Sequence, residues 1–541
     1  MRKLLLLTGF LLIAQFSIAQ LKFVARFEVP SEIDDPLFEM SYLDLNKIIS
    51  FRSMPEKGFT NKRKLQYFIS DQNLEPESEL IEMPVKDGFD MVGFDLDEGY
   101  LYLLFSKGFT PTSTRYILQI DLETNEGVEF SVDNVLGIVL REFLVQNKKV
   151  IFMGNADTRP VVQIYDLVTK GVYTVHGIYA NDTQLMQIRK LPEMKSLQVV
   201  LNRKGKYRNR DLYVNTYDMN GNLMQEVKVD QFGEPGQEIL NGILISKDTY
   251  QETLIGSYGL ERRDAYQGMF IMDINEFGEH SFKLYTLEDF PNFYNYLGER
   301  QKKKRDAKIL SELEKDKLPA IENTYTIRDV RLVADAYYVF FDQYSAVNAR
   351  ADYQQGLYGP SSGYRFDRWN RMQGFPSLND PVMNRYPFIH SDRHATEYRY
   401  YSAHFAKVAK TGQVLWDNSS SYNELITTYP MAFSEIAVVE DELYHAYIED
   451  LTIKLSYFNK GEKIFENHEF DLALVDENER IVDTNAESLR IIHWYDRYYL
   501  VTGTQRVKYQ DDTGGVATRE AYFLTKIVVD GDLYHPEGLS D

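Results

Sequence analysis

The chain has 541 residues, of which 44% are hydrophobic and 26% are charged, a balance that excludes a mostly disordered or collagen-like protein. Its formal net charge of −21 argues against nucleic acid as a partner, because affinity for phosphates requires clustered Lys and Arg. Aromatic residues make up 14% of the chain, and these side chains favour β-strands over helices.

The first 19 residues have the pattern of a secretion signal. A short basic start precedes an apolar run over residues 4–14, and Ser17 and Ala19 are the small residues that signal peptidase requires. A membrane anchor is the alternative, but it needs about 20 apolar residues. We therefore expect residues 1–19 to be a signal peptide, with no membrane span elsewhere and a periplasmic or extracellular location.

The absence of cysteine excludes several kinds of exported protein and of chemical site. With no Cys in the sequence, disulfides, thiolate metal sites, a Cys nucleophile and a cysteine-linked lipid anchor are all excluded. The chain must depend on its own apolar core, which its length permits. The tail Pro536–Asp541 carries no evident sorting domain, so we expect the periplasm rather than the cell surface.

A repeated unit predicts the architecture. Each copy is a strand with Tyr or Phe, then Asp or Asn in a short polar turn usually containing Gly, then another strand, because these turn residues tolerate positive φ or bond to their own backbone. A further pair of apolar strands precedes most copies, which gives the four strands of a β-propeller blade. The eight copies cover residues 67–73, 116–127, 164–171, 213–221, 270–278, 405–412, 455–461 and 522–531.

The spacing of the units supports this interpretation. Gly127, Gly171 and Gly221 lie 44 and 50 residues apart, close to the ~40–50 residues of propeller repeats. We therefore predict an all-β fold over residues 20–541: a β-propeller of seven or eight four-stranded blades, with eight favoured. The strand over residues 21–27 would complete the last blade and cover its exposed edge. Two stacked β-sandwiches are the alternative.

A helix is predicted as the first of two insertions. Residues 295–318 are rich in helix formers and end before Pro319. Five basic residues lie between Arg300 and Arg305. A solvated helix face is the ordinary interpretation of such a run. The secretion signal argues against a nucleic-acid signal, and a contact with anionic lipid or glycan stays open.

The second insertion, residues 345–399, is a long loop rich in Tyr, Phe and Trp, which we expect to cap one face of the propeller. Loops of this length in compact domains are usually functional or disordered, and the aromatic density argues against disorder. Aromatic and Arg side chains dominate binding hot spots, although the same aromatics would also form the core of the insertion itself. The candidate binding residues are Tyr364, Arg365, Phe366, Arg368, Trp369, Arg371 and Tyr386.

Four residues form the densest group of possible metal ligands: His390, Asp392, His394 and His404. Three imidazoles and a carboxylate can bind zinc, but this spacing fits no established zinc signature. Loop histidines bonded to nearby backbone or carboxylates are the favoured alternative. We predict no metal and no other cofactor.

No motif in the chain assigns a reaction. There is no G-x-S-x-G nucleophile elbow and no Walker-type loop. Asp95, Asp97 and Glu98 resemble the start of a calcium loop but lack its later ligands, so an ordinary hairpin turn is predicted there. Carboxylates are too abundant for the sequence to nominate a catalytic pair. The lack of motifs favours a binding protein over an enzyme.

Three features occur in a fixed order: residues Gln301–Arg305, the strand beginning Ala336-Tyr-Tyr-Val-Phe with its Tyr-rich insertion, and residues Gly412–Asn418. This arrangement resembles secreted propeller-like proteins of unassigned function in Bacteroidota, mainly over residues 295–420. The resemblance implies a propeller and an envelope location, and it carries no catalytic residues across.

From these features together we expect a cell-envelope binding or scaffold protein. It would recognise an envelope protein or a glycan through the face that the 345–399 insertion caps. A glycan-active hydrolase or lyase, with carboxylates on that same face, is the alternative.

Overall fold

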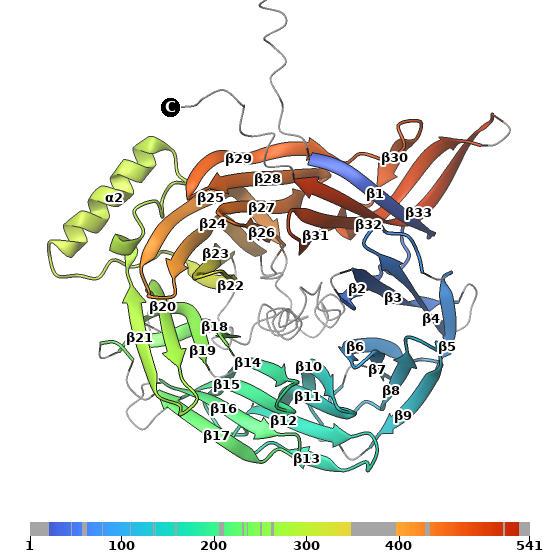
Figure 1. Cartoon of the computed structure of the whole chain (residues 1–541), viewed down its shortest axis with the longest axis horizontal. Coiled ribbons are helices and arrows are strands. Elements are labelled where there is room, and N and C mark those ends of the chain that lie inside the picture. The colour runs from blue at the N-terminus through green and yellow to red at the C-terminus, as the bar shows by residue number, and fades with distance from the viewer. Residues whose placement is uncertain are drawn as a thin grey trace, which may run out of the picture. The chain divides into compact units, whose positions relative to one another are not determined.

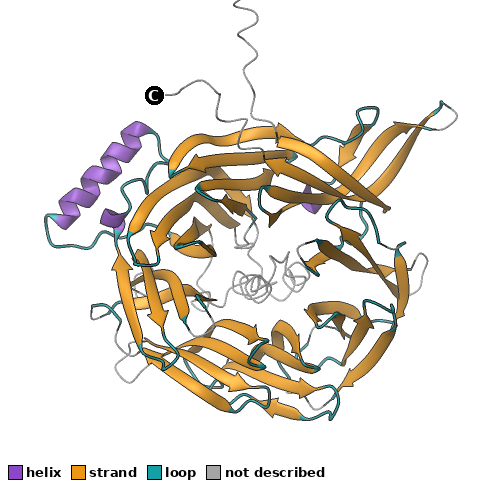
Figure 2. Cartoon of the chain, viewed as in Figure 1, coloured by secondary structure: helices purple, strands orange, loops and turns teal. Residues whose placement is uncertain are grey.

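The fold is a β-propeller with eight antiparallel blades (Figures 1 and 2), so the predicted all-β architecture is confirmed with eight blades rather than seven. The computed structural model describes residues 21–529 except 45, 57–61, 78, 109, 134, 136, 157–158, 205–209, 230–231, 235, 249–250, 261–264, 348–396, 428–432 and 512–513.

The blades belong to two compact units. Residues 38–72 and 77–432 form one unit, which holds six blades. The described parts of residues 21–37, 73–76 and 433–529 form the other, which holds two. We call them the six-blade unit and the two-blade unit and describe each by itself.

In the six-blade unit every blade is a run of four consecutive strands, each paired antiparallel with the next. The first three blades are β2 (Glu39–Tyr42), β3 (Lys47–Pro55), β4 (Arg63–Asp71) and β5 (Ile81–Val85); β6 (Asp90–Asp97), β7 (Tyr100–Ser106), β8 (Arg115–Asp121) and β9 (Gly127–Val132); and β10 (Val139–Gln146), β11 (Lys149–Ala156), β12 (Arg159–Asp166) and β13 (Val172–Thr174). The next three are β14 (Thr183–Leu191), β15 (Ser196–Lys204), β16 (Arg210–Asp218) and β17 (Leu223–Val229); β18 (Glu238–Ser246), β19 (Glu252–Leu260), β20 (Ala265–Ile274) and β21 (His280–Tyr285); and β22 (Thr324–Val333), β23 (Ala336–Val347), β24 (Glu397–Ala409) and β25 (Val414–Thr427).

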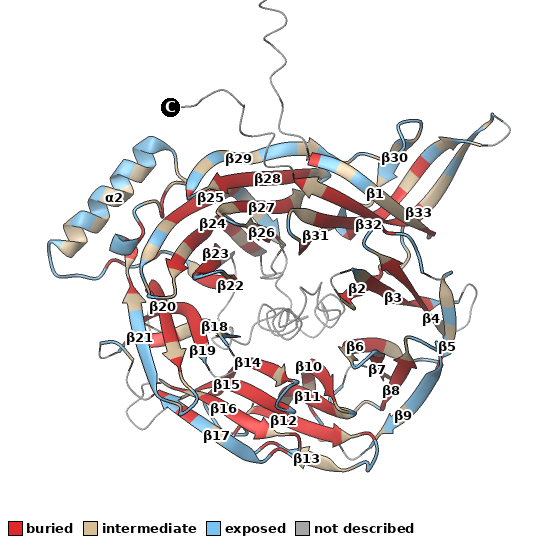
Figure 3. Cartoon of the chain, viewed as in Figure 1, coloured by how far each residue is buried: buried red, intermediate tan, exposed pale blue. Residues whose placement is uncertain are grey.

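Apolar packing between neighbouring blades forms the core of this unit. The inner and middle strands are almost continuously buried, whereas outer strands such as β9 face solvent (Figure 3). Phe51 of the first blade, for example, meets Phe94 of the second edge-to-face, with ring centroids 4.7 Å apart. The middle strand β7 is an almost uninterrupted apolar run because both of its faces are covered, whereas inner strands such as β14 also bury polar side chains, among them Gln187 and Arg189.

The two-blade unit contains the chain's first described strand and its last. One blade comprises β26 (Glu435–Val439), β27 (Glu442–Glu449), β28 (Thr452–Asn459) and β29 (Glu462–Asp471). The other comprises β30 (Arg480–Thr484), β31 (Arg490–Tyr495), β32 (Tyr498–Gln510), β33 (Val516–Val529) and β1 (Leu21–Pro30). β1 pairs with β33, from Leu21 opposite Val529 to Pro30 opposite Ala521. The prediction that residues 21–27 complete the last blade is confirmed.

Helices are few among the described residues. The predicted inserted helix is present as α2 (Glu299–Leu313), and two short 3-10 helices are η2 (Leu287–Asp289) and η3 (Ala486–Ser488). None of the helices in the described part of the chain is long and apolar enough to cross a bilayer. Most of the second insertion, residues 348–396, lies outside the described residues.

Gly256 provides a test of the strand packing. It lies opposite Gly242 in the β18–β19 pair, where a Cβ on Gly256 would overlap the carbonyl oxygen of Asn241 and the Cα of Gly242. We expect Gly256→Ala to lower the free energy of unfolding by about 2 kcal/mol, since backbone must move to admit the methyl group. Denaturant unfolding measures the change. Gly298→Ala is the control, because no atom lies within 4 Å of its Cβ position, and an equal loss in both variants would contradict the account.

Candidate ligand-binding cavity

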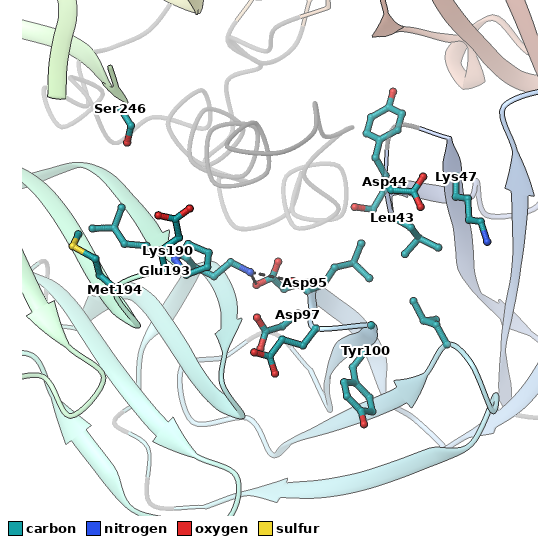
Figure 4. Close-up of a pocket in the computed structure, with 18 of the residues that line it drawn as sticks. Leu43, Asp44, Lys47, Asp95, Asp97, Tyr100, Lys190, Glu193, Met194 and Ser246 are labelled. Carbon is teal, nitrogen blue, oxygen red and sulfur yellow. Dashed lines mark hydrogen bonds and ion pairs between the residues drawn. The ribbon is translucent and has the colours of Figure 1, made fainter. Parts of the chain in front are cut away.

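A cavity of about 1440 Å³ lies within the six-blade unit (Figure 4). The turns that join the first and second strands of four blades supply most of its wall, together with the end of β22 and the turn after β8. The first strand is the innermost strand of each of these blades (Figure 1). The first turns of the first, second, fourth and fifth blades therefore meet around one cavity although they are distant in sequence.

The cavity wall is strongly acidic. Three basic side chains line it, and each of them is already ion-paired: Lys47 with Glu77 at 2.8 Å, Lys190 with Asp95 at 2.7 Å, and Arg331 with Asp329 at 3.0 Å. The wall therefore presents an excess of negative charge, and such a concave site attracts cations. The ten carboxylates that line it belong to Asp44, Glu77, Asp95, Asp97, Glu98, Asp121, Glu123, Glu193, Asp248 and Glu252.

Lys190 and Asp95 have a structural role. The Lys190 ammonium donates to Asp95 Oδ2 at 2.7 Å, to the carbonyl of Leu96 at 3.1 Å and to the carbonyl of Val145 at 3.0 Å, and Figure 4 shows it reaching across to Asp95. Asp95 also accepts the backbone N–H of Val145 at 2.6 Å. These bonds join three blades, and both bonds to Asp95 end on the same carboxylate oxygen, Oδ2.

Glu98 and Gly99 form a two-residue turn between β6 and β7. Both have positive φ, 48° and 83°, as the favoured hairpin turns require. The hairpin predicted at Asp95–Gly99 is confirmed, and it holds the exposed Glu98 side chain at the cavity.

Asp97 is the cavity residue with the most perturbed acidity. Burial raises the pKa of its carboxyl from 3.8 to about 6, and the nearby charges of Asp95 and Glu98 act in the same direction. Lys190 and a hydrogen bond from the backbone N–H of Asn147, at 2.8 Å, oppose the shift. The charge of the cavity therefore changes near pH 6.

Asp121 shows the opposite behaviour in the same cavity. Its Oδ1 accepts the backbone N–H groups of Thr124 at 3.0 Å and Glu123 at 2.9 Å. These bonds hold the pKa of Asp121 below its usual value. Such a carboxylate stabilises its own turn.

His404 is a core residue. It is 3% exposed, its ring stacks on Phe293 with centroids 4.0 Å apart, and its Nε2 lies 2.9 Å from Ser402 Oγ. Burial lowers the pKa of His404 to about 3. Across the described ranges no three His, Cys, Asp or Glu side chains are grouped to hold a metal ion.

The other sequence-based candidates lie outside the described residues. They are His390, Asp392 and His394 of the metal group and Tyr364, Arg365, Phe366, Arg368, Trp369, Arg371 and Tyr386 of the binding group. The insertion that contains them leaves β23 at Val347 and rejoins β24 at Glu397, which pair with each other. At the other end of the same pair, Ala336 opposes Ala409 next to the cavity residue Leu332. The cavity and the attachment points of the insertion are thus at opposite ends of this blade.

Asp97 predicts a specific pH dependence of stability. Its pKa in the folded chain lies above the ordinary value, so its contribution to stability is complete below about pH 4 and is lost as the pH rises through about 6. Relative to the parent chain, Asp97→Asn should therefore gain thermal stability between pH 4 and pH 7, as calorimetric Tm values would show.

Asp121→Asn is the matched control, with the opposite sign. The lowered pKa of Asp121 contributes stability above the ordinary value of 3.8, so this variant should lose Tm relative to the parent chain over the same range. Parallel pH profiles for the two variants would contradict the assignment.

Comparison with known proteins finds likeness of fold alone. The sequence matches no described protein family and no curated protein. The β-propeller domain of the Trilobed protease from Pyrococcus furiosus is 8% identical, with a TM-score of 0.31 over 80% of this chain and 97% of that chain. The polysaccharide lyase Uly1 is 11% identical, with a TM-score of 0.37 over 94% and 100%. A structure from work on two prolyl endopeptidases is 7% identical, with a TM-score of 0.36 over 90% of this chain and 53% of that one.

Proposed function

We propose that this chain is an exported binding protein that recognises an envelope protein or a glycan. The cavity of the six-blade unit carries the proposal, because its size suits a specific ligand and its negative charge favours a ligand that is positively charged. Ten carboxylates face three basic groups that are already paired, so the part of the partner that enters should be positively charged. A basic peptide segment or an amino sugar meets that requirement.

The state of the carboxylates supports binding over catalysis. Asp95 and Asp121 are occupied by bonds within the protein, which fix the cavity wall rather than leave a base free to act. Preformed charge of this kind supplies selectivity and fast association.

The export of the chain is part of the proposal and depends on the sequence. Residues 1–19 would direct the chain out of the cytoplasm, and the absence of Cys argues against a lipid anchor. A periplasmic location is part of the same proposal, and the resemblance to secreted Bacteroidota proteins over residues 295–420 supports it.

Three exposed glutamates of the cavity test the binding role: Glu98, Glu123 and Glu193. Changing all three to Gln should weaken binding of an oligolysine peptide about tenfold, because each exposed charge contributes a fraction of a kcal/mol. Isothermal titration at low salt measures the effect.

A second triple variant controls for the change in net charge. Glu234, Glu276 and Glu314 are exposed and lie away from the cavity lining, so changing them to Gln should leave the affinity within about twofold. Equal weakening in both triples would show that oligolysine responds to the overall charge and not to the cavity.

A glycan-active hydrolase or lyase is the second candidate, and Asp97 favours it. A carboxyl whose pKa is about 6 stays partly protonated near neutral pH, as a general acid must. Release of new sugar ends from a glycan by the parent chain, lost in Asp97→Asn, would replace the binding proposal with this one.

The aromatic insertion remains a proposed second contact for a protein or glycan partner. Tyr364, Phe366 and Trp369 are residues of the type that stack on sugars or fill hot-spot pockets. Changing these three to Ala should abolish retention on an immobilised glycan array while Tm stays unchanged. Retention equal to that of the parent chain would remove the insertion from the binding role.

A further inference from the structure

Helix α2 carries a cationic face that the cavity does not explain. Arg300, Lys303 and Lys304 are exposed and form no ion pair with any other described residue. Residues three and four apart lie on the same side of a helix, with neighbouring side chains roughly 5–6 Å apart. On a chain whose net charge is −21, this face is a local region of the opposite sign.

Neighbouring residues of α2 are held in place by the rest of the unit. Arg305 forms a two-bond ion pair with Glu322, with N–O distances of 2.5 and 2.8 Å, and Lys308 reaches the same carboxylate at 3.4 Å. Ile309 packs against the apolar core of the fifth and sixth blades. These contacts fix the position of α2, and therefore also the positions from which Arg300, Lys303 and Lys304 extend.

The segment before the helix is fixed as well. Asp417 of β25 accepts the backbone N–H of Asn292 at 2.9 Å, and Asn295 donates to Asn418 at 3.1 Å. Phe293 and Tyr294 are buried in the core. Because the backbone that carries these cations is already fixed, binding a ligand costs only the conformational freedom of the side chains themselves.

Stability of the helix does not account for these charges. Basic residues near the beginning of a helix oppose the helix dipole, and here the cations lie in the first two turns while no basic residue lies in the last. Gly298 caps the helix without a side-chain hydrogen bond. The cations are placed where they cost stability, which is expected of groups that serve binding.

We infer that the outer face of α2 binds an acidic polysaccharide through Arg300, Lys303 and Lys304. A linear polymer with repeated carboxylates or sulfates can lie along the helix and touch little else. Because the helix stands at the outer margin of the six-blade unit (Figure 1), such a chain keeps its charges away from the acidic blades. This site is independent of the cavity and would hold the protein on its glycan while the cavity takes a cationic ligand.

A membrane surface fits these observations less well. A planar bilayer in contact with α2 would come within about one helix diameter, roughly 10–12 Å, of the blades behind it. That distance is close to the screening length of about 8–10 Å, so the acidic body would be repelled. Binding within the interface also needs an apolar helix face, and α2 exposes little more than Leu310.

The test compares two triple variants of the full chain. Arg300→Gln, Lys303→Gln and Lys304→Gln together remove the cationic face and keep good helix formers. Lys170→Gln, Lys195→Gln and Lys204→Gln remove the same charge from exposed positions on the third and fourth blades. The probes are heparin as the sulfated polymer, polygalacturonate as the carboxylated polymer and dextran as the neutral one.

We expect the parent chain to bind at least one acidic polymer and not dextran, with affinity that falls as salt rises. The α2 triple should bind more than tenfold more weakly with a Tm that is equal to that of the parent chain or slightly higher, because the removed cations opposed the helix dipole. The control triple should bind within about twofold of the parent chain. Binding to one polymer alone identifies the anionic group as sulfate or carboxylate.

Three results would overturn the inference: no binding by the parent chain, equal binding by the α2 triple, or tighter binding to vesicles of anionic lipid or to duplex DNA than to either polymer. The triple Glu98→Gln, Glu123→Gln and Glu193→Gln should keep polysaccharide binding. A failure of the cavity proposal can therefore be told apart from a failure of this one.

Discussion

Burial of apolar side chains between neighbouring blades is the constraint on which the six-blade unit depends. Each four-stranded sheet covers the next. Phe51 and Phe94 are one example of this packing, and other apolar side chains fill the space between the following pair of blades. This packing fixes the inner strands, and the inner strands fix the turns at their ends. The position of the cavity residues thus follows from core packing. Lys190 strengthens the arrangement because its ammonium bonds to Asp95, Leu96 and Val145 on two other blades.

The turns that line the cavity carry its acidic side chains, and some of these side chains also hold the turns in place through hydrogen bonds. At the end of a strand, backbone N–H groups can hold the pKa of a carboxylate low, as for Asp121, or burial can raise the pKa although one backbone N–H is accepted, as for Asp97. One residue type therefore serves two purposes within one cavity, and the local hydrogen bonds decide which. The excess charge that remains on exposed side chains such as Glu98 and Glu193 is available to a ligand.

The repeat, a count of seven or eight blades, the inserted helix and the role of residues 21–27 were predictable, because turn chemistry and strand composition are local properties of the sequence. The cavity was not. Lys190 and Asp95 are 95 residues apart, and only the order of the blades brings them together. His404 shows the converse: it was grouped with His390 and His394 because they are close in sequence. Its strand, however, turns the ring into the core beside Phe293. The aromatic strand that contains Phe405 was the available signal, since it predicts buried neighbours.

The pairing of β1 with β33 ties together the two ends of the described chain, Leu21 and Val529. Contacts of such long separation form late, because the loop between them must first be closed. The last blade keeps an open edge until then, and an open edge recruits strands from other molecules. A chain that has lost its first strand would therefore expose the edge of β33 permanently.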